Sequence, residues 1–275
     1  SKKTVSRVIN ESPLVREETR KKVKRIIAET GFTPNPQARA LAFRKSFLIG
    51  LVYDNPSPQY VVNMQRGILD TLGDTAFQLV LRPCDRGEEG YRERVRSFIL
   101  QHKQHGIILT PSVSEDEELA EILREEQCDY VRIASLELDI PSRSIRTHDA
   151  QGAEMAAAHL AQLGHKRIGH IHGPKTFRSA HERLSGFKRG LEGYGLELAP
   201  ELTVEGAYTF DSGVTSATRL LNRHDRPTAS FAGNDDMAVG VYVAARKAGL
   251  RIPEDLSIVG FDDTPISARI WPPLT

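Results

Sequence analysis

The stretch Phe47-Leu48-Ile49-Gly50-Leu51-Val52-Tyr53 decides the fold, because it opens an alternation of strands and helices that continues to residue 261. It is a short apolar run that is followed by the polar pair Asp54 and Asn55. Such a run is typical of a strand buried on both faces. Six similar runs follow it along the chain. The predicted strands are 47–53, 77–81, 106–109, 130–134, 167–171, 229–232 and 257–261.

Segments with helical periodicity separate most of these runs. They lie at about 58–72, 88–104, 115–127, 150–163, 178–194, 211–223 and 235–249. Buried strands that alternate with helices predict an α/β fold of parallel sheets flanked by helices. The pattern restarts near residue 149, which predicts a first lobe at 47–148, a second lobe at 149–275 and a cleft between them.

Ligands of such sheets bind outside the carboxyl ends of the strands, so the loops that follow the strands are the place to look for a site. These loops carry carboxylates, an arginine, an asparagine and tyrosines, which together suit a polyhydroxylated ligand such as a sugar. The candidate effector-binding residues are Asp54, Tyr60, Asp149, Arg183, Tyr208, Asn234 and Asp262. Asp235, Asp236 and Asp263 are expected to cap helices instead.

Residues 1–46, before the alternation, form a short basic head. A first helix at 1–10 can be capped by the hydroxyl of Ser1. Its apolar face consists of Val5, Val8 and Ile9. Its other side carries Lys2, Lys3 and Arg7 beside the short polar Thr4 and Ser6. A helix of this kind fits the major groove of DNA, where Arg and Lys pair with guanine.

A second helix is predicted at about 16–29, ended by Gly31, with an apolar face and a strongly basic side. The apolar residues are Val23, Ile26 and Ile27. A third segment, 36–42, follows Asn35 as its cap and begins with Pro36. It contains good helix formers but is too short to be stable alone.

Charge is divided unevenly along the chain. Residues 1–46 hold twelve Lys or Arg and four Asp or Glu, whereas the other 229 residues hold 25 basic and 32 acidic side chains. A basic head on an acidic body indicates a polyanionic partner for the head, and double-stranded DNA is the favoured one. A membrane surface is the alternative, and the lack of a long apolar face in the head argues against it.

The head contains the motifs Thr4-Val5-Ser6-Arg7-Val8-Ile9-Asn10, Thr19-Arg20 and Phe32 through Leu41. Together they resemble the headpiece and hinge of the lac/galactose repressor (LacI/GalR) family of bacterial transcriptional regulators. The resemblance implies that 1–10 is the recognition helix of a helix-turn-helix, that 36–42 is a hinge helix formed on the operator, and that Leu41 enters the minor groove. The DNA contacts it implies are Lys2, Lys3, Thr4, Ser6, Arg7, Asn10, Thr19, Asn35, Ala38 and Leu41.

The body resembles the same family in four further motifs. They are His159 through Pro174, Arg183-Leu184-Ser185-Gly186-Phe187, Asn234-Asp235-Asp236-Met237-Ala238 and Val259-Gly260-Phe261-Asp262-Asp263. They imply a two-lobed, periplasmic-binding-protein-like sensor in which Arg183, Asn234 and Asp262 contact the effector. Tyr208 matches the stacking aromatic, and Asp149 and Tyr60 match positions that line the pocket. The segment 54–60 departs from the family's pattern, which leaves the identity of the effector open.

The family's pattern places a further helix before the recognition helix and further elements after residue 275. We therefore expect the chain to be truncated at both ends, its headpiece to be partial and its first lobe to be incomplete. The chain as given is expected to bind an operator poorly.

Composition and motifs limit the other classes of function. No apolar run approaches the length of about 20 residues that spans a membrane, and no secretion signal is visible, so a cytoplasmic protein is predicted. Cys84 and Cys128 are isolated, and no cofactor or metal site is expected. A sugar-acting enzyme is an alternative, but no phosphate loop, dinucleotide fingerprint or nucleophile elbow occurs, and His170 and His172 are expected to be structural.

The sequence therefore predicts a homodimeric repressor whose binding to operator DNA is controlled by a small-molecule effector, expected to be a sugar. A stand-alone sugar-binding protein is the second alternative, and the basic head argues against it.

Overall fold

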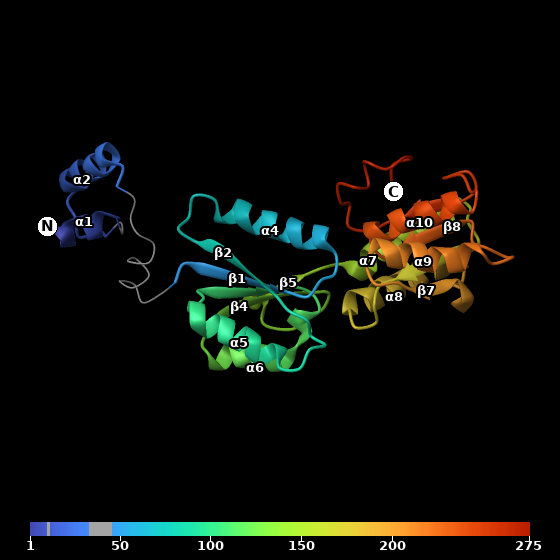
Figure 1. Ribbon diagram of the computed structural model, residues 1–275, viewed down its shortest axis with the longest axis horizontal. Coiled ribbons are helices and arrows are strands. Elements are labelled where there is room, and N and C mark those ends of the chain that lie inside the picture. The colour runs from blue at the N-terminus through green and yellow to red at the C-terminus, as the bar shows by residue number, and fades with distance from the viewer. Residues whose placement is uncertain (10–11, 33–45) are drawn as a thin grey trace.

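The computed structural model describes residues 1–9, 12–32 and 46–275 and contains two parallel sheets (Figure 1). The first sheet has the strand order β2-β1-β3-β4-β5 and the second has the order β7-β6-β8-β9. The strands of the first sheet are β1 (Leu48–Tyr53), β2 (Gln78–Pro83), β3 (Gly106–Leu109), β4 (Asp129–Ala134) and β5 (Ser144–Arg146). Those of the second are β6 (Ile168–His172), β7 (Thr203–Glu205), β8 (Ala229–Ala232) and β9 (Ser257–Val259).

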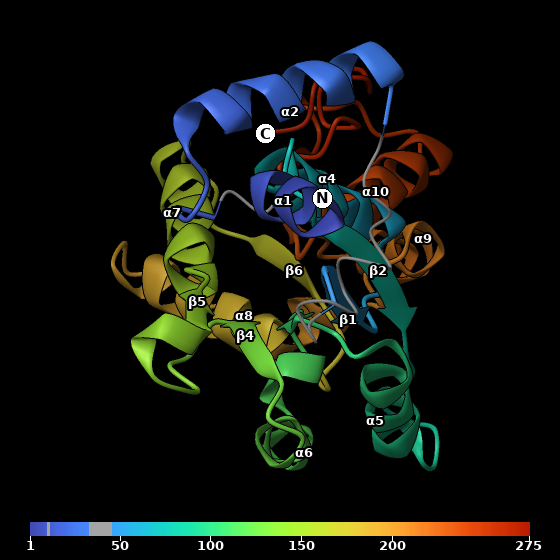
Figure 2. The ribbon, with the colours of Figure 1, turned by 90° about the vertical axis from the view of Figure 1, so that its left-hand side faces the viewer.

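Three helices flank the first sheet, and we call this sheet with its helices the first lobe. They are α4 (Pro58–Leu72), α5 (Tyr91–His102) and α6 (Glu117–Glu125). Helices α5 and α6 lie on one face and α4 lies on the other, as the two perpendicular views agree (Figure 1, Figure 2). The core lies on the α5 and α6 side, where Val95, Leu119 and Leu123 are fully buried. Helix α4, by contrast, buries only Val61.

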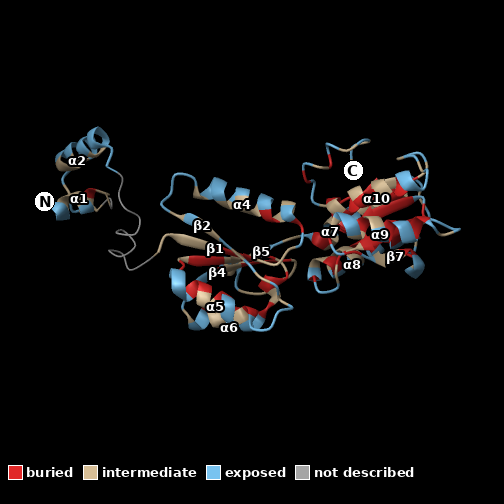
Figure 3. Cartoon of the chain, viewed as in Figure 1, coloured by how far each residue is buried: buried red, intermediate tan, exposed pale blue. Residues whose placement is uncertain are grey.

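The second sheet is covered on both faces, and we call it with its helices the second lobe. The helices are α7 (Asp149–Gln162), α8 (Arg178–Glu192), α9 (Phe210–Leu221) and α10 (Asp235–Lys247). In β8, Phe231 packs on the α7 and α8 side and Ala232 packs on the α9 and α10 side. Because alternate side chains of one strand enter two cores, every residue of β8 is buried (Figure 3), which explains why three of its four residues are apolar.

The α/β fold of two parallel sheets flanked by helices is confirmed. Each of the seven predicted strands and seven predicted helices of the body is present, with ends shifted by a few residues. The edge strands β5 and β7 are additional. Each has only three residues and contains polar side chains, so neither shows the apolar run that identifies a buried strand.

The head contains α1 (Lys2–Ile9) and α2 (Glu17–Thr30). The Ser1 hydroxyl accepts a hydrogen bond from the Thr4 amide at 3.3 Å, so the predicted cap of α1 is confirmed. The predicted end of α2 is confirmed as well, because Gly31 has φ 62° and its N–H bonds to the Ile27 carbonyl. Val8 is 1% exposed, which makes α1 a helix with one buried face.

Helices α7 and α8 approach so closely that Gly186 has no room for a side chain. A Cβ added there would overlap the carbonyl oxygen of Ala150, which is backbone and cannot move aside cheaply. We expect Gly186→Ala to lower the free energy of unfolding by about 1–3 kcal/mol, the usual cost of overpacking a core. Gly193, at the end of the same helix, has only ordinary contacts and a right-handed conformation. Chemical denaturation should show that Gly193→Ala is nearly neutral, and an equal loss in both variants would contradict the packing argument.

Candidate effector site and DNA-binding surface

Six of the seven predicted effector residues meet around one small hollow between the two lobes. The hollow has a volume of about 50 Å³, and we call it the inner hollow. Tyr60 comes from α4 of the first lobe, and the others come from the second lobe. The six residues are Tyr60, Asp149, Arg183, Tyr208, Asn234 and Asp262.

Arg183 lies at the centre of the inner hollow, and its side chain is only 11% exposed. Its Nε donates to Asp149 Oδ1 at 2.8 Å, and its Nη2 lies 3.6 Å from Asp262 Oδ1. A third bond goes to the carbonyl of Gly233, and the guanidinium stacks 3.8 Å from the centre of the Phe261 ring. These contacts hold the planar fork of donors in one orientation, as selective binding of hydroxyl groups requires.

Two tyrosines form walls of the inner hollow. Tyr208 is 5% exposed, has φ 57° and lies against Gly173, where a Cβ would overlap the ring. Phe177 packs edge-on against Tyr208 with ring centres 5.5 Å apart. Burial raises the pKa of both Tyr60 and Tyr208. Both phenols therefore stay protonated and present a neutral hydroxyl and an aromatic face to a ligand.

Asn234 lines the inner hollow, but its own amide is used inside the protein. Its Oδ1 accepts from the Met237 amide at 3.0 Å, which caps α10. Its Nδ2 donates to the carbonyl oxygen of Tyr208 at 3.0 Å. Asn234 therefore holds the backbone of Tyr208 in place as well as capping α10.

The prediction that Asp235, Asp236 and Asp263 cap helices is wrong. The helix α10 begins at Asp235, one residue earlier than a cap at Asp235 requires, so Asn234 takes the cap. Asp235 instead accepts from the Phe261 and Thr264 amides and ties down the loop after β9. Asp236 accepts from the Ser57 hydroxyl at 2.8 Å and so bridges the two lobes. Asp263 accepts from the hydroxyl of Ser267 in a turn.

Asp54 is the predicted effector residue that lies apart from the other six. Its carboxylate accepts from the Ser112 hydroxyl and lines a neighbouring hollow of about 680 Å³, which we call the outer hollow. The chain turns after β1, so Asp54 and its neighbour Asn55 face different hollows. Sequence reasoning missed several polar residues of the inner hollow. They are Asn55, Ser57, Thr147 and Ser179. Thr147 directly follows β5, so it would have been a candidate if β5 had been predicted as a strand.

Asp262 carries the site's clearest pH dependence. Burial raises the pKa of its carboxyl group to about 7. The positive charge of Arg183 lowers this pKa, and the negative charges of Asp235, Asp149 and Asp236 raise it. An acid whose pKa is raised in the folded protein binds more protons folded than unfolded. It therefore lowers stability as the pH rises from the ordinary value of 3.8 to about 7.

We expect Asp262→Asn to remove this loss of stability. Between pH 5 and pH 7, the melting temperature of the parent protein should fall relative to that of the variant, as calorimetry can measure. Burial lowers the pKa of His170 to about 3, which acts in the opposite direction but is common to both proteins and cancels in the difference. Parallel curves for parent and variant would contradict the assignment.

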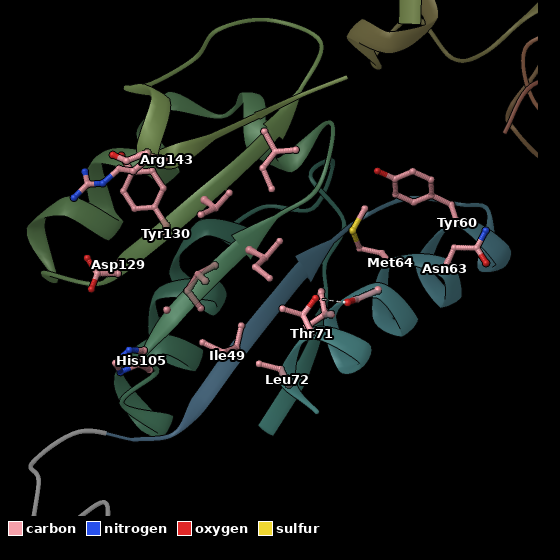
Figure 4. Close-up of a pocket in the computed structure, with 18 of the residues that line it drawn as sticks. Ile49, Tyr60, Asn63, Met64, Thr71, Leu72, His105, Asp129, Tyr130 and Arg143 are labelled. Atoms are coloured by element: carbon pink, nitrogen blue, oxygen red, sulfur yellow. Dashed lines mark hydrogen bonds between the residues drawn. The ribbon is translucent and has the colours of Figure 1, made fainter. Parts of the chain in front are cut away.

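A further hollow, of about 1070 Å³, lies on the open face of the first sheet beside α4 (Figure 4). Figure 4 shows Met64, Thr71 and Leu72 of α4 facing side chains from the strands, among them Ile49. Its lining is mainly apolar, and of the effector set only Tyr60 and Asp262 reach it, at one end. Because Arg183 and Asn234 do not line it, this hollow is not the site that the polar residues build.

The head presents its predicted DNA-contacting face to solvent. Lys2, Lys3 and Ser6 are exposed, and Arg7 and Thr4 are half-buried. The basic side of α2 is exposed at Lys21, Lys22, Lys24 and Arg25, whereas half-buried Thr19 lies beside Arg20. Arg20 is used internally, because it donates to the Ser12 carbonyl at 2.7 Å and holds the turn between the helices. The predicted contacts Asn10, Asn35, Ala38 and Leu41, and the hinge 36–42, lie outside the described residues.

Within the described ranges, no cluster of three or more His, Cys, Asp or Glu side chains could hold a metal ion. His170 is fully buried, stacks on Phe231 at 4.8 Å and bonds to its carbonyl, as expected of a structural histidine. The helices of the described part of the chain include none that is long and apolar enough to cross a membrane.

Two family models match the chain, one at each end. Residues 1–35 match the bacterial regulatory proteins of the lacI family, and residues 157–275 match the periplasmic binding protein-like domain. These matches agree with the helices of the head and with the fold of the second lobe.

Relatives match over nearly the whole chain. Catabolite control protein A of Priestia megaterium is 34% identical over 273 residues, which are 99% of this chain and 82% of that protein. The ribose operon repressor of Haemophilus influenzae is 35% identical over 279 residues, 100% of this chain and 82% of that protein. Both are regulators by name. Truncation of this chain at its ends stays a prediction.

Solved structures agree with these relatives. The complex of the transcriptional regulator CelR with cellobiose has a TM-score of 0.74 at 31% identity and covers 100% of this chain and 83% of that one. The lac repressor dimer bound to operator and the anti-inducer ONPF has a TM-score of 0.79 at 30% identity, with 100% and 82% covered. The basic helix α1, the two-lobed body and these similarities lead to one conclusion: the chain belongs to the LacI family of bacterial regulatory proteins and is a DNA-binding transcriptional regulator, not an enzyme.

Proposed function

We propose that this regulator is a repressor controlled by a sugar bound between its lobes. Residues 1–46 form the DNA-binding head and hinge, 47–148 the first lobe and 149–275 the second. The observation that carries the proposal is the convergence of six polar and aromatic side chains on the inner hollow. Carboxylates accept from sugar hydroxyls, the Arg183 fork donates to them, and tyrosine rings stack on the apolar face of a sugar. The names of relatives support the same ligand class, since they include a ribose repressor and a cellobiose complex.

The lobes are closed on one another at this site. Ser57 of the first lobe bonds to Asp236 of the second beside the inner hollow. A space of about 50 Å³ is far below the roughly 300–1,000 Å³ of small-molecule sites. The effector therefore binds a state in which the lobes are further apart or differently rotated. Its differential affinity for that state shifts the population between the two states.

The DNA-bound unit is proposed to be a homodimer, because each head reads one half of a palindromic operator. Rotation of the lobes moves the two segments 36–42 of the dimer relative to each other. That movement strengthens or weakens the binding of these segments to the operator, with Leu41 as the side chain that enters the minor groove. The similarity to an operator-bound dimer supports this arrangement.

Thermal-shift screening of the full-length protein against sugars and nucleobases tests the ligand class. A sugar at about 100 times its dissociation constant should stabilise the protein by about 2.7 kcal/mol and raise its melting temperature by several degrees. Stabilisation by nucleobases alone would contradict the proposal. So would chemical turnover of the sugar, which chromatography of the incubated ligand detects.

A further inference from the structure

The outer hollow adjoins the inner hollow along the same cleft. Its volume of about 680 Å³ lies within the usual range of ligand sites, and its walls come from both lobes. The same segments line both hollows with neighbouring residues: Pro56 faces the outer hollow, and Asn55 and Ser57 face the inner one. The outer walls include exposed Asp85 and Thr176, so this hollow is the side of the site that is open to solvent.

Two aromatic rings mark the boundary between the hollows. Phe177 lines the outer hollow, Tyr208 lines the inner one, and their rings touch edge to face. Phe177 with Pro56 and Pro174 gives the outer hollow apolar walls beside its charged groups. A ligand that lies against Tyr208 and continues toward solvent therefore meets a second surface of mixed polar and apolar character, which is the kind of surface that binds a sugar ring.

The charges of the outer hollow favour a neutral ligand. Three carboxylates line it, Asp54, Asp85 and Asp116, against the two guanidinium groups of Arg86 and Arg92. Arg92 is already held by Asp116 at 2.8 Å and by Glu118 at 2.7 Å. An anionic group such as a phosphate would meet more negative than available positive charge.

Arg86 is the donor that remains available. Arg86 is half-buried and forms no hydrogen bond or ion pair with any residue that the structure describes, although its charge lowers the pKa of Asp54, Glu115 and Asp116, which burial raises. Arg86 with Asp54 offers a fork of donors beside a carboxylate acceptor. The outer hollow therefore holds an arginine and carboxylates, the residue types that Arg183, Asp149 and Asp262 provide in the inner hollow.

We propose that the effector is a neutral oligosaccharide of at least two rings: once the lobes have moved to admit one ring at Arg183, the next ring lies in the outer hollow against Arg86 and Asp54. The proposal rests on the proposed function, that the cleft binds a sugar. It adds the size and the charge of that sugar and assigns Arg86 as a residue that determines specificity.

Calorimetric titration of the full-length protein tests this with glucose, galactose and ribose against cellobiose, maltose and lactose, and with glucose 6-phosphate as the charged probe. We expect a disaccharide to bind about tenfold tighter than any of the monosaccharides, the value of about one added charge-assisted hydrogen bond. Arg86→Ala and Thr176→Trp, which remove a donor and fill the outer hollow, should cancel this gain and leave monosaccharide affinity within about twofold. Arg94→Ala is the matched control, because Arg94 is an exposed arginine of α5 that is paired with Glu88. This variant should change neither the disaccharide affinity nor the monosaccharide affinity.

The outcomes separate this inference from the function on which it rests. If no sugar binds the parent protein, the proposed function fails. If a monosaccharide binds as tightly as every disaccharide, or if glucose 6-phosphate binds tightest, the two-ring neutral ligand is wrong while the sugar site stands. Equal losses for short and long sugars in Arg86→Ala and Thr176→Trp would also overturn the second subsite.

Discussion

Replacing Arg183 with alanine is expected to lower effector affinity by about 100-fold or more while operator affinity stays within about twofold. The guanidinium is buried, is held by Asp149 and Gly233, and stacks on Phe261, so its donors face the ligand with little freedom left to lose. Two charge-assisted hydrogen bonds, at about 1.5–3 kcal/mol each, account for an effect of this size. The predicted DNA-binding face lies on α1, far from Arg183 in the sequence, and the substitution does not alter it.

The companion variants separate loss of recognition from loss of folding. Arg183→Lys keeps the positive charge that offsets Asp149 and Asp262 but removes the planar fork, so it should also lose effector binding. Arg189→Ala, on an exposed part of the same helix α8, should bind normally. Titration calorimetry and melting curves on all three variants are the measurements. Normal induction by Arg183→Ala, with an unchanged melting temperature, would contradict the site assignment.

Replacing Lys2, Lys3 and Arg7 together with alanine is expected to abolish sequence-specific operator binding by the full-length protein. Each base-reading side chain contributes about 1–3 kcal/mol of discrimination, so the triple variant should lose about 100-fold or more in specific affinity. Lys2 and Lys3 are exposed on α1, and Val8 fixes the opposite face of that helix. Loss of specific binding should exceed loss of non-specific binding.

The control for this prediction is Lys22→Ala on α2. A phosphate contact carries no sequence information, so this variant should weaken specific and non-specific binding alike. The slope of the logarithm of the binding constant against the logarithm of the salt concentration should become shallower by about 1. Fluorescence anisotropy with an operator and a scrambled duplex, each at several salt concentrations, distinguishes the two patterns. If the triple variant behaved like Lys22→Ala, α1 would not be the element that reads the bases.

Much of the fold follows from local sequence. The run Ala229–Ala232 could be assigned as a strand because three of its four residues are apolar and helical segments flank it. The strand Ser144–Arg146 could not, because a three-residue edge strand with Ser and Arg has no periodicity to detect. The cap of α10 was misassigned by one residue, and helix ends are uncertain by that amount from sequence alone.

Six residues that line the inner hollow could be named from the sequence, but their arrangement could not. The order of strands and helices placed Arg183, Asn234 and Asp262 at the same edge of the second sheet. The sequence could not show that the side-chain amide of Asn234 forms hydrogen bonds to α10 and to Tyr208, or that Asp54 lines the outer hollow. Those outcomes depend on backbone turns and on contacts between residues far apart in the chain.

A ligand bound between the lobes is expected to control how tightly the heads bind DNA. The most direct test is to measure operator affinity of the full-length protein by anisotropy, with a palindromic duplex selected by that protein from random sequence, in the absence and presence of the sugar that stabilises it. We expect the sugar to change operator affinity by about tenfold or more, which is within the coupling of about 1–3 kcal/mol typical of allosteric proteins. Arg183→Ala should remove this change. Operator affinity that stays the same at saturating sugar would contradict this expectation.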